Sequence, residues 1–253
     1  DHKGLGITAR GAFVCIRRHF RELGIDIDRD PIDVVGVGDM SGDVFGNGVL
    51  LSRALRLRAA FDHRHIFLDP DPDPAVSYAE RARMFALARS SWADYDKTKL
   101  SAGGGVYPRN AKTVPLSAEA RAMLGLEGER VAPEAVLRAI LSMPADLLYF
   151  GGIGTFVKAS HESHAEAGDR ANDAIRIDAR ALRAKVVGEG ANLAMTQAAR
   201  VEAALAGVRV DADSLHNSAG VDTSDHEGNL KILLDQLVQA GDLTAKQRDA
   251  PPA

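Results

Sequence analysis

The sequence predicts an α/β fold with a doubly wound, mostly parallel sheet, helices on both faces and an inserted region. Three observations favour this class. An apolar strand pattern runs into a glycine-rich turn, strand and helix patterns alternate again in the second half, and glycine-rich or polar segments directly follow several strands. Because ligands of such sheets bind at the carboxyl ends of the strands, we expect a binding site at that edge.

The first elements have the order of a Rossmann-like nucleotide-binding unit. An amphipathic helix is predicted over residues 8–23 and a buried strand over 33–37. After the glycine turn we expect a helix over about 42–56 and a strand over 65–68 that ends in Asp69. Strand, glycine turn, helix and a second strand ending in an acid form the smallest dinucleotide-binding unit.

The glycine turn supplies the first candidate binding residues. Its spacing is G-x-G-x-x-x-G, one residue longer than the usual fingerprint. Glycine lets the backbone approach a pyrophosphate, and the helix N-terminus behind it supplies N–H groups. The alternative is a strained loop without a ligand, marked by Gly46 and Gly48. The candidate cofactor-binding residues here are Gly36, Gly38, Asp39, Met40, Ser41 and Gly42.

Asp69 is the candidate for binding the adenosine ribose. A carboxylate at the end of the second strand can accept hydrogen bonds from both ribose hydroxyls and would repel a 2′-phosphate. This predicts NAD rather than NADP as the cofactor. The alternative is that Asp69 is a surface acid.

Residues 70–130 interrupt the alternation of strands and helices. They open with three Asp-Pro pairs that begin at Asp69, and proline excludes helix there. A short helix with Ser117 as its N-cap is predicted further on. We interpret the region as an insertion that either covers the adenosine side or forms an interface with other domains. The expected division is 1–69 and 131–225 for the nucleotide-binding domain, 70–130 for the insertion, and 226–253 for a C-terminal helix leading to regions outside this chain.

Regular α/β order resumes in the second half. Three segments at or near strand ends, 151–155, 188–192 and 217–224, are predicted to be loops. Any one of them is explained by an ordinary turn, but three beside a glycine turn predict a cleft. Gly152 and Asn192 are the candidate cofactor contacts in these loops. The expected strands are 146–150, 184–188 and 208–212, and the expected helices are 133–142, 196–206 and 226–238.

Composition excludes several classes of function. The net charge of −4 argues against nucleic acid as a partner, and no apolar run approaches the roughly 18 residues of a membrane span. Cys15 is the single cysteine, most simply a small core residue, and this usage favours a reducing compartment such as the cytoplasm. His161 and His164 have ligand spacing on a helix, but a third ligand is missing, so no metal is assigned.

Four segments together resemble the glutamate dehydrogenase superfamily, and most closely its very large bacterial NAD-specific members. They occur in the family's order, at 7–11, 36–43, 188–192 and 217–224. T-A-R-G is similar to the family's A-T-G-R-G helix start, E-G-A-N is shared, and the last segment fits N-x-x-G-V-x-x-S. By resemblance, Thr8 and Asn192 lie near the nicotinamide amide and ribose, and Ser224 contacts the substrate's side-chain carboxylate.

The resemblance implies reversible, NAD-dependent oxidative deamination of L-glutamate to 2-oxoglutarate and ammonium, by a full-length protein that forms a homo-oligomer. The departures are the extra turn residue, Ala9 in place of a family glycine, and 151–155 in place of an A-A-x-x-N-like segment. The family's lysine-bearing P-x-G-G-x-K-G motif does not occur, so no catalytic residue is assigned. We therefore expect a coenzyme-binding part that needs a substrate domain, N-terminal to Asp1, for turnover. The alternatives are a coenzyme domain of another amino-acid dehydrogenase and a non-catalytic NAD sensor.

Overall fold

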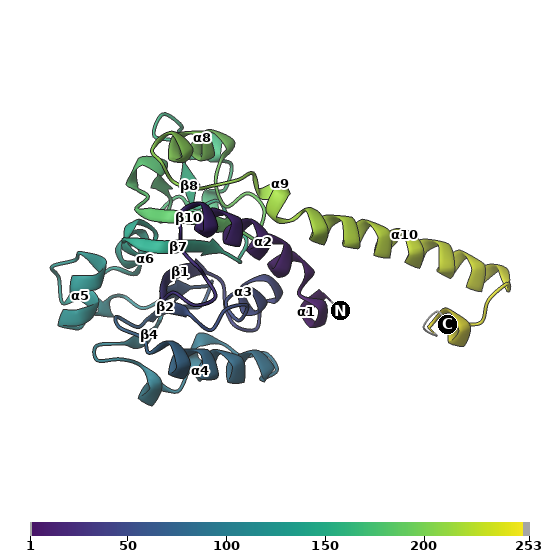
Figure 1. Cartoon of the computed structure of the whole chain (residues 1–253), viewed down its shortest axis with the longest axis horizontal. Coiled ribbons are helices and arrows are strands. Elements are labelled where there is room, and N and C mark those ends of the chain that lie inside the picture. Colours follow the sequence, from purple (N-terminus) through teal and green to yellow (C-terminus); the bar gives the residue numbers. More distant parts are fainter. Residues whose placement is uncertain (1, 250–253) are drawn as a thin grey trace.

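A six-stranded sheet with the order β10-β7-β1-β2-β3-β4 forms the centre of the computed structural model, which describes residues 2–249 (Figure 1). Helices cover both faces of this sheet, so the predicted doubly wound α/β class is confirmed. The strands of the sheet are β1 (Ile32–Val37), β2 (Leu55–Phe61), β3 (His65–Leu68), β4 (Gly105–Pro108), β7 (Ala145–Phe150) and β10 (Ala184–Glu189).

Strand direction decides which loops meet at each edge. Strands β10, β7, β1 and β2 are parallel neighbours. Strand β3 is antiparallel to β2, and β4 is antiparallel to β3. The carboxyl ends of β10, β7, β1, β2 and β4 therefore meet at one edge, whereas β3 ends at the opposite edge.

Alternating side chains of the central strands divide the interior into two cores. In β1, Val34 packs with helices α2 (Ile7–Glu22), α3 (Asp43–Gly48) and α4 (Pro74–Ala86). Its neighbour Val35 points to the other face, which is covered by α5 (Ala118–Leu124), α6 (Pro133–Ser142) and α8 (Gln197–Leu205). The period of two in the strand thus supplies both helix layers.

Shorter elements complete the described chain. Helix α5 is capped as predicted, because the Ser117 hydroxyl accepts from the N–H of Ala120 and Gly125 follows in a left-handed conformation. The remaining elements are α1 (His2–Leu5), η1 (Trp92–Asp94), η2 (Lys97–Lys99), β5 (Val114–Pro115), β6 (Arg130–Val131), β8 (Val157–Lys158), α7 (His164–Ala167), η3 (Arg170–Asn172), β9 (Ile177–Asp178) and η4 (Ala179–Ala181).

The C-terminal helices extend away from the sheet. Helix α9 (Asp213–His216) leads into α10 (Ser218–Ala240), which projects from the domain before α11 (Ala245–Arg248) (Figure 1). The predicted loop at 217–224 is therefore wrong. Its hydroxyl groups are accommodated in the helix, where Thr223 donates to the carbonyl of Ala219 one turn earlier. Among residues 2–249, no helix combines the length and apolar character that a membrane span needs.

Two further predictions are wrong. The helix expected over 42–56 ends at Gly48, and the sequence L-R-L-R-A-A-F from Leu55 forms strand β2 instead. Its alternating buried and half-buried residues have the period of a strand, not of a helix. The strand expected at 208–212 is reduced to one isolated bridge between Arg209 and Val186.

Arg81 of α4 holds the end of α3 and the start of β2 in place. Its side chain is fully buried and donates to the carbonyls of Val49, Ser77 and Leu55, the last two at 3.2 and 3.0 Å. Burial lowers the pKa of Arg81 to about 10, so the guanidinium remains charged at neutral pH. Its guanidinium supplies hydrogen-bond donors to the carbonyls that follow the last residue of α3 and open β2.

We expect Arg81→Met to lower the free energy of unfolding by about 2 kcal/mol, because the thioether fills the space but leaves buried carbonyls without a donor. Urea denaturation measures this change. Arg18→Ala is the control, since Arg18 is exposed and forms only a surface pair with Glu22, and we expect it to change stability by less than about 0.5 kcal/mol. Equal effects of the two substitutions would contradict the role given to Arg81.

Candidate functional site

A cavity of 490 Å³ lies at the edge where the parallel strands end. It brings together segments that follow four different strands of the sheet. Four of the residues predicted from the sequence line it: Gly38, Asp39, Gly42 and Gly152. The polar or charged lining residues that were not predicted are Asp62, His63, Arg109 and Asn172.

The glycine turn is shaped first by the packing of α3. A Cβ atom at Gly36 would lie 2.3 Å from Cε2 of Phe45, and one at Gly38 would lie 2.6 Å from Cβ of Phe45. Gly38 also has φ of 142°, which side chains rarely allow. Across the cavity, a Cβ at Gly152 would lie 3.4 Å from Cα of Gly38. The glycines thus let two backbone segments and one aromatic ring approach closely.

The turn itself leaves few groups free for a ligand. The Asp39 carboxylate accepts from the N–H groups of Ser41 and Gly42, both at 2.8 Å, and from the Ser41 hydroxyl at 2.6 Å. Met40 is fully buried in the core. Within the described chain, the N–H groups of Asp39 and Met40 have no hydrogen-bond acceptor. Any contact of the turn with an anion is therefore made by backbone at its first residues.

Trp92 holds the glycine turn in place through a hydrogen bond. Its ring is fully buried, and the indole N–H donates to the Gly38 carbonyl at 2.9 Å. Trp92 belongs to the region 70–130, so this region contacts the glycine turn directly.

Asp62 provides a second acidic group of the cavity, beside Asp39. It follows β2 at the same edge as the glycine turn and is 6% exposed. Its Oδ1 accepts from the N–H groups of Arg64 and His65, at 2.7 and 2.6 Å. Its buried Oδ2 has no hydrogen-bond partner in the described structure. A neighbouring polar ligand would satisfy this oxygen.

Asp69, which the sequence predicts to be the ribose-binding acid, does not line this cavity. It follows the antiparallel strand β3 and therefore lies towards the opposite edge of the sheet. The side chain is fully buried, and Oδ1 accepts from the N–H and the hydroxyl of Ser101. Burial raises the pKa of Asp69, and the two hydrogen bonds from Ser101 offset only part of this rise. Its role is to attach the loop near Ser101 to the sheet.

Thr8, Asn192 and Ser224 lie outside the cavity, near the start of α10. The Asn192 side chain accepts from Nδ2 of Asn217 at 3.0 Å. Gly220 packs on Thr8 so closely that a Cβ there would lie 2.0 Å from Oγ1 of Thr8. Ser224 is exposed one helical turn beyond Gly220. Asn192 and Thr8 thus both lie against the start of α10, and Ser224 lies one turn further along this helix.

Buried charges hold the segment that carries Asn192. Arg200 donates two hydrogen bonds of 2.8 Å to the Glu189 carboxylate and lies 3.2 Å from Asp213. Asp213 accepts from the N–H of Leu193 at 2.8 Å, where the backbone has the left-handed φ of 64°. Such bonds stabilise a conformation that a leucine adopts only under constraint.

His216 completes this support, and its hydrogen bonds argue against a metal. Its fully buried ring accepts from the Glu189 N–H at Nδ1, at 2.8 Å, so the proton of the neutral ring is on Nε2, facing Asp211 at 3.5 Å. The ligand atoms of Cys15, Asp211 and His216 lie within 4.8 Å of one another, but a protonated nitrogen cannot bind a metal. Cys15 is half-buried, which corrects its predicted place in the core.

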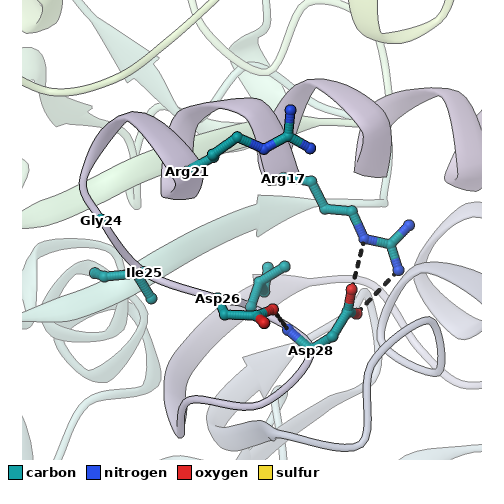
Figure 2. A pocket seen from close by; sticks show the side chains of 7 residues that line it. Arg17, Arg21, Gly24, Ile25, Asp26 and Asp28 are labelled. Carbon is teal, nitrogen blue, oxygen red and sulfur yellow. Dashed lines mark hydrogen bonds and ion pairs between the residues drawn. The ribbon is translucent and has the colours of Figure 1, made fainter.

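A second hollow, of 410 Å³, has a different character (Figure 2). It lies between the end of α2 and the loop that precedes β1, so it is not at the carboxyl edge of the sheet. Arg17 there donates to both oxygens of Asp28, at 3.2 and 2.9 Å, and Arg21 lies nearby (Figure 2). The charge of Arg17 is already neutralised, so this surface feature is not the candidate site.

The fold, with its cavity at the carboxyl edge of the parallel strands, defines a protein of the doubly wound α/β class. Comparison with known proteins gives the family. The chain belongs to the bacterial NAD-glutamate dehydrogenases, whose catalytic-domain model matches residues 1–251.

Curated relatives agree with this assignment. The chain is 60% identical to the NAD-specific glutamate dehydrogenase of Mycobacterium tuberculosis, over 98% of this chain and 16% of that protein. It is 58% identical to the enzyme of that name from Pseudomonas aeruginosa, over 99% of this chain and 15% of that protein. The chain therefore spans only a small part of these relatives. A glutamate dehydrogenase structure from Plasmodium falciparum has 15% identity and a TM-score of 0.49, covering 85% of this chain and 36% of that one.

We expect stability to depend on the protonation of His216. Burial lowers its pKa below 6.5, although Asp211 opposes this, so the unfolded chain binds the proton more readily. The stabilisation is present above about pH 6.5 and is lost as the pH falls through the lowered pKa of the folded state. Urea denaturation between pH 5 and 8 measures this, and His216→Gln, which keeps an acceptor but does not titrate, removes part of the slope.

His226→Gln is the matched control for this measurement. The carbonyl of Asp222 raises the pKa of the exposed His226, so its removal changes the slope in the opposite direction. A pH profile that is identical in the wild type and His216→Gln would contradict the assignment of the buried neutral ring.

Proposed function

We propose that this chain is the coenzyme-binding part of an NAD-specific glutamate dehydrogenase, which converts L-glutamate, NAD and water to 2-oxoglutarate, ammonium and NADH. The observation that carries the proposal is the cavity that joins the glycine turn at the end of β1 to Asp62 at the end of β2, whose Oδ2 has no hydrogen-bond partner in the described structure. The family assignment and the names of the relatives support the cofactor and the substrate.

The residues at this edge fit the parts of a dinucleotide in order. Asp62 would accept hydrogen bonds from the hydroxyls of the adenosine ribose, and these would give its Oδ2 a hydrogen-bond partner. The closely packed backbone at Gly38 and Gly152, with the free N–H of Asp39, would hold the pyrophosphate. The nicotinamide end would then extend towards β10, where Thr8 and Asn192 lie.

The charge of Asp62 favours NAD over NADP. A 2′-phosphate beside a buried carboxylate is repelled, and the low local dielectric strengthens this repulsion. The sequence argument for NAD therefore remains, with Asp62 in place of Asp69.

NAD, when bound, would supply the hydride acceptor for oxidation at the α-carbon of glutamate, and this chain would position its nicotinamide ring. Ser224, on α10, would contact the side-chain carboxylate of the substrate. The catalytic lysine and aspartate would come from another part of the full-length protein.

The assignment of the ribose-binding acid can be tested by exchanging two aspartates. We expect Asp62→Asn to weaken NAD binding about tenfold and to reduce discrimination against NADP, because it removes a charged acceptor. Asp69→Asn leaves NAD affinity within about twofold, since Asp69 only holds the loop near Ser101. Isothermal titration calorimetry with both cofactors measures these changes. An Asp69→Asn variant with the larger loss would restore the sequence prediction.

The division of labour predicts a separation between binding and turnover. We expect the 253-residue chain to bind NAD in calorimetry and to give no NADH with glutamate, whereas the full-length protein gives both. Absorbance at the NADH band follows the reaction. Turnover of glutamate by the purified chain would contradict the proposal that catalytic groups lie elsewhere.

A further inference from the structure

Arg109 brings the region 70–130 into the cavity. It follows β4, whose carboxyl end lies at the same edge as those of β1 and β2. The backbone N–H of Arg109 donates to the carbonyl of Arg64 at 2.8 Å, which ties this segment to the loop that carries Asp62. The position is therefore fixed by backbone pairing and not by a mobile loop.

The guanidinium of Arg109 is available to a ligand. It is half-buried, and Nη1 donates to the backbone carbonyl of Asp62 at 3.0 Å. No other hydrogen bond of this side chain, and no ion pair, occurs within residues 2–249. Its central carbon lies 5.9 Å from the centre of the Phe61 ring. A planar cation with several free donors thus forms part of the cavity wall.

The order of residues along the sheet edge indicates what Arg109 contacts. From the middle of the sheet outwards, the cavity is lined by Gly38 after β1, Asp62 after β2 and Arg109 after β4. If the pyrophosphate lies at the glycines and the ribose at Asp62, the next group outwards is the adenine base. A guanidinium plane stacks on aromatic rings, whereas a phosphate at this point would lie beside the Asp62 carboxylate.

We propose that Arg109 stacks on the adenine base of bound NAD, and this inference rests on the proposed function. The region 70–130 then covers the adenosine end of the cofactor site, which is one of the two roles that the sequence allowed. At the glycine turn, Trp92 of the same region donates a hydrogen bond to the Gly38 carbonyl, so the region 70–130 also supports that part of the cavity.

The experiment compares Arg109→Ala, Arg109→Lys and the control Arg130→Ala in the full-length protein. Arg130 is an exposed arginine of the same region, so its removal changes the net charge equally. Calorimetry gives the Kd for NAD, for NADP, for ADP-ribose and for nicotinamide mononucleotide, which lacks the adenosine. We expect Arg109→Ala to weaken NAD and ADP-ribose about tenfold and to leave the mononucleotide unchanged. Arg109→Lys, which keeps the charge but not the plane, loses most of this affinity.

Other results would overturn the inference in distinguishable ways. Unchanged NAD affinity in Arg109→Ala refutes the adenine contact and leaves the proposed function intact. A loss confined to NADP assigns Arg109 to a 2′-phosphate instead, and an equal loss for the mononucleotide shows a general distortion of the site. If the wild type does not bind NAD, the proposed function fails and this inference with it.

Discussion

The close packing of Phe45 against glycine backbone is the constraint on which the site depends. A side chain at Gly36, Gly38 or Gly151 would place its Cβ within 2.3 to 2.6 Å of Phe45, so all three positions exclude one. Phe45 therefore seats α3 directly on the carboxyl ends of β1 and β7. The glycines of the turn are needed for this packing in any case, and their approach to a ligand is a second use of the same free space.

The short α3 also determines where the acidic residue lies. Because α3 ends at Gly48, the chain turns back early and Leu55 begins the second parallel strand. The acid at the end of that strand is Asp62, beside the turn. The next strand runs the other way and carries Asp69 out of the site. The length of α3 thus decides which of two aspartates seven positions apart, Asp62 or Asp69, lies beside the glycine turn.

Local sequence patterns predicted the elements whose apolar residues clearly follow either a strand pattern or a helix pattern. The strands β1, β7 and β10 and the helices α2, α6 and α8 were found, because short apolar runs next to glycine or proline favour strands and amphipathic stripes favour helices. Residues 55–61 failed because leucine and arginine both have high helix propensity, and pairing with β1 overrides it. Arg109 carries no local signal at all, since its place depends on how β4 pairs with β3.

The two ends of the candidate site are therefore held by different forces. At the proposed adenosine end, Asp62 and Arg109 are placed by strand pairing and backbone hydrogen bonds. At the end of β10, the segment with Asn192 is held by the buried pair of Glu189 and Arg200, with Asp213 as a second acceptor. A buried pair that loses one partner leaves an uncompensated charge, so this end is the more sensitive to substitution. Strand pairing tolerates changes of side chain, so the proposed adenosine end is where we expect that cofactor preference can change without loss of the fold.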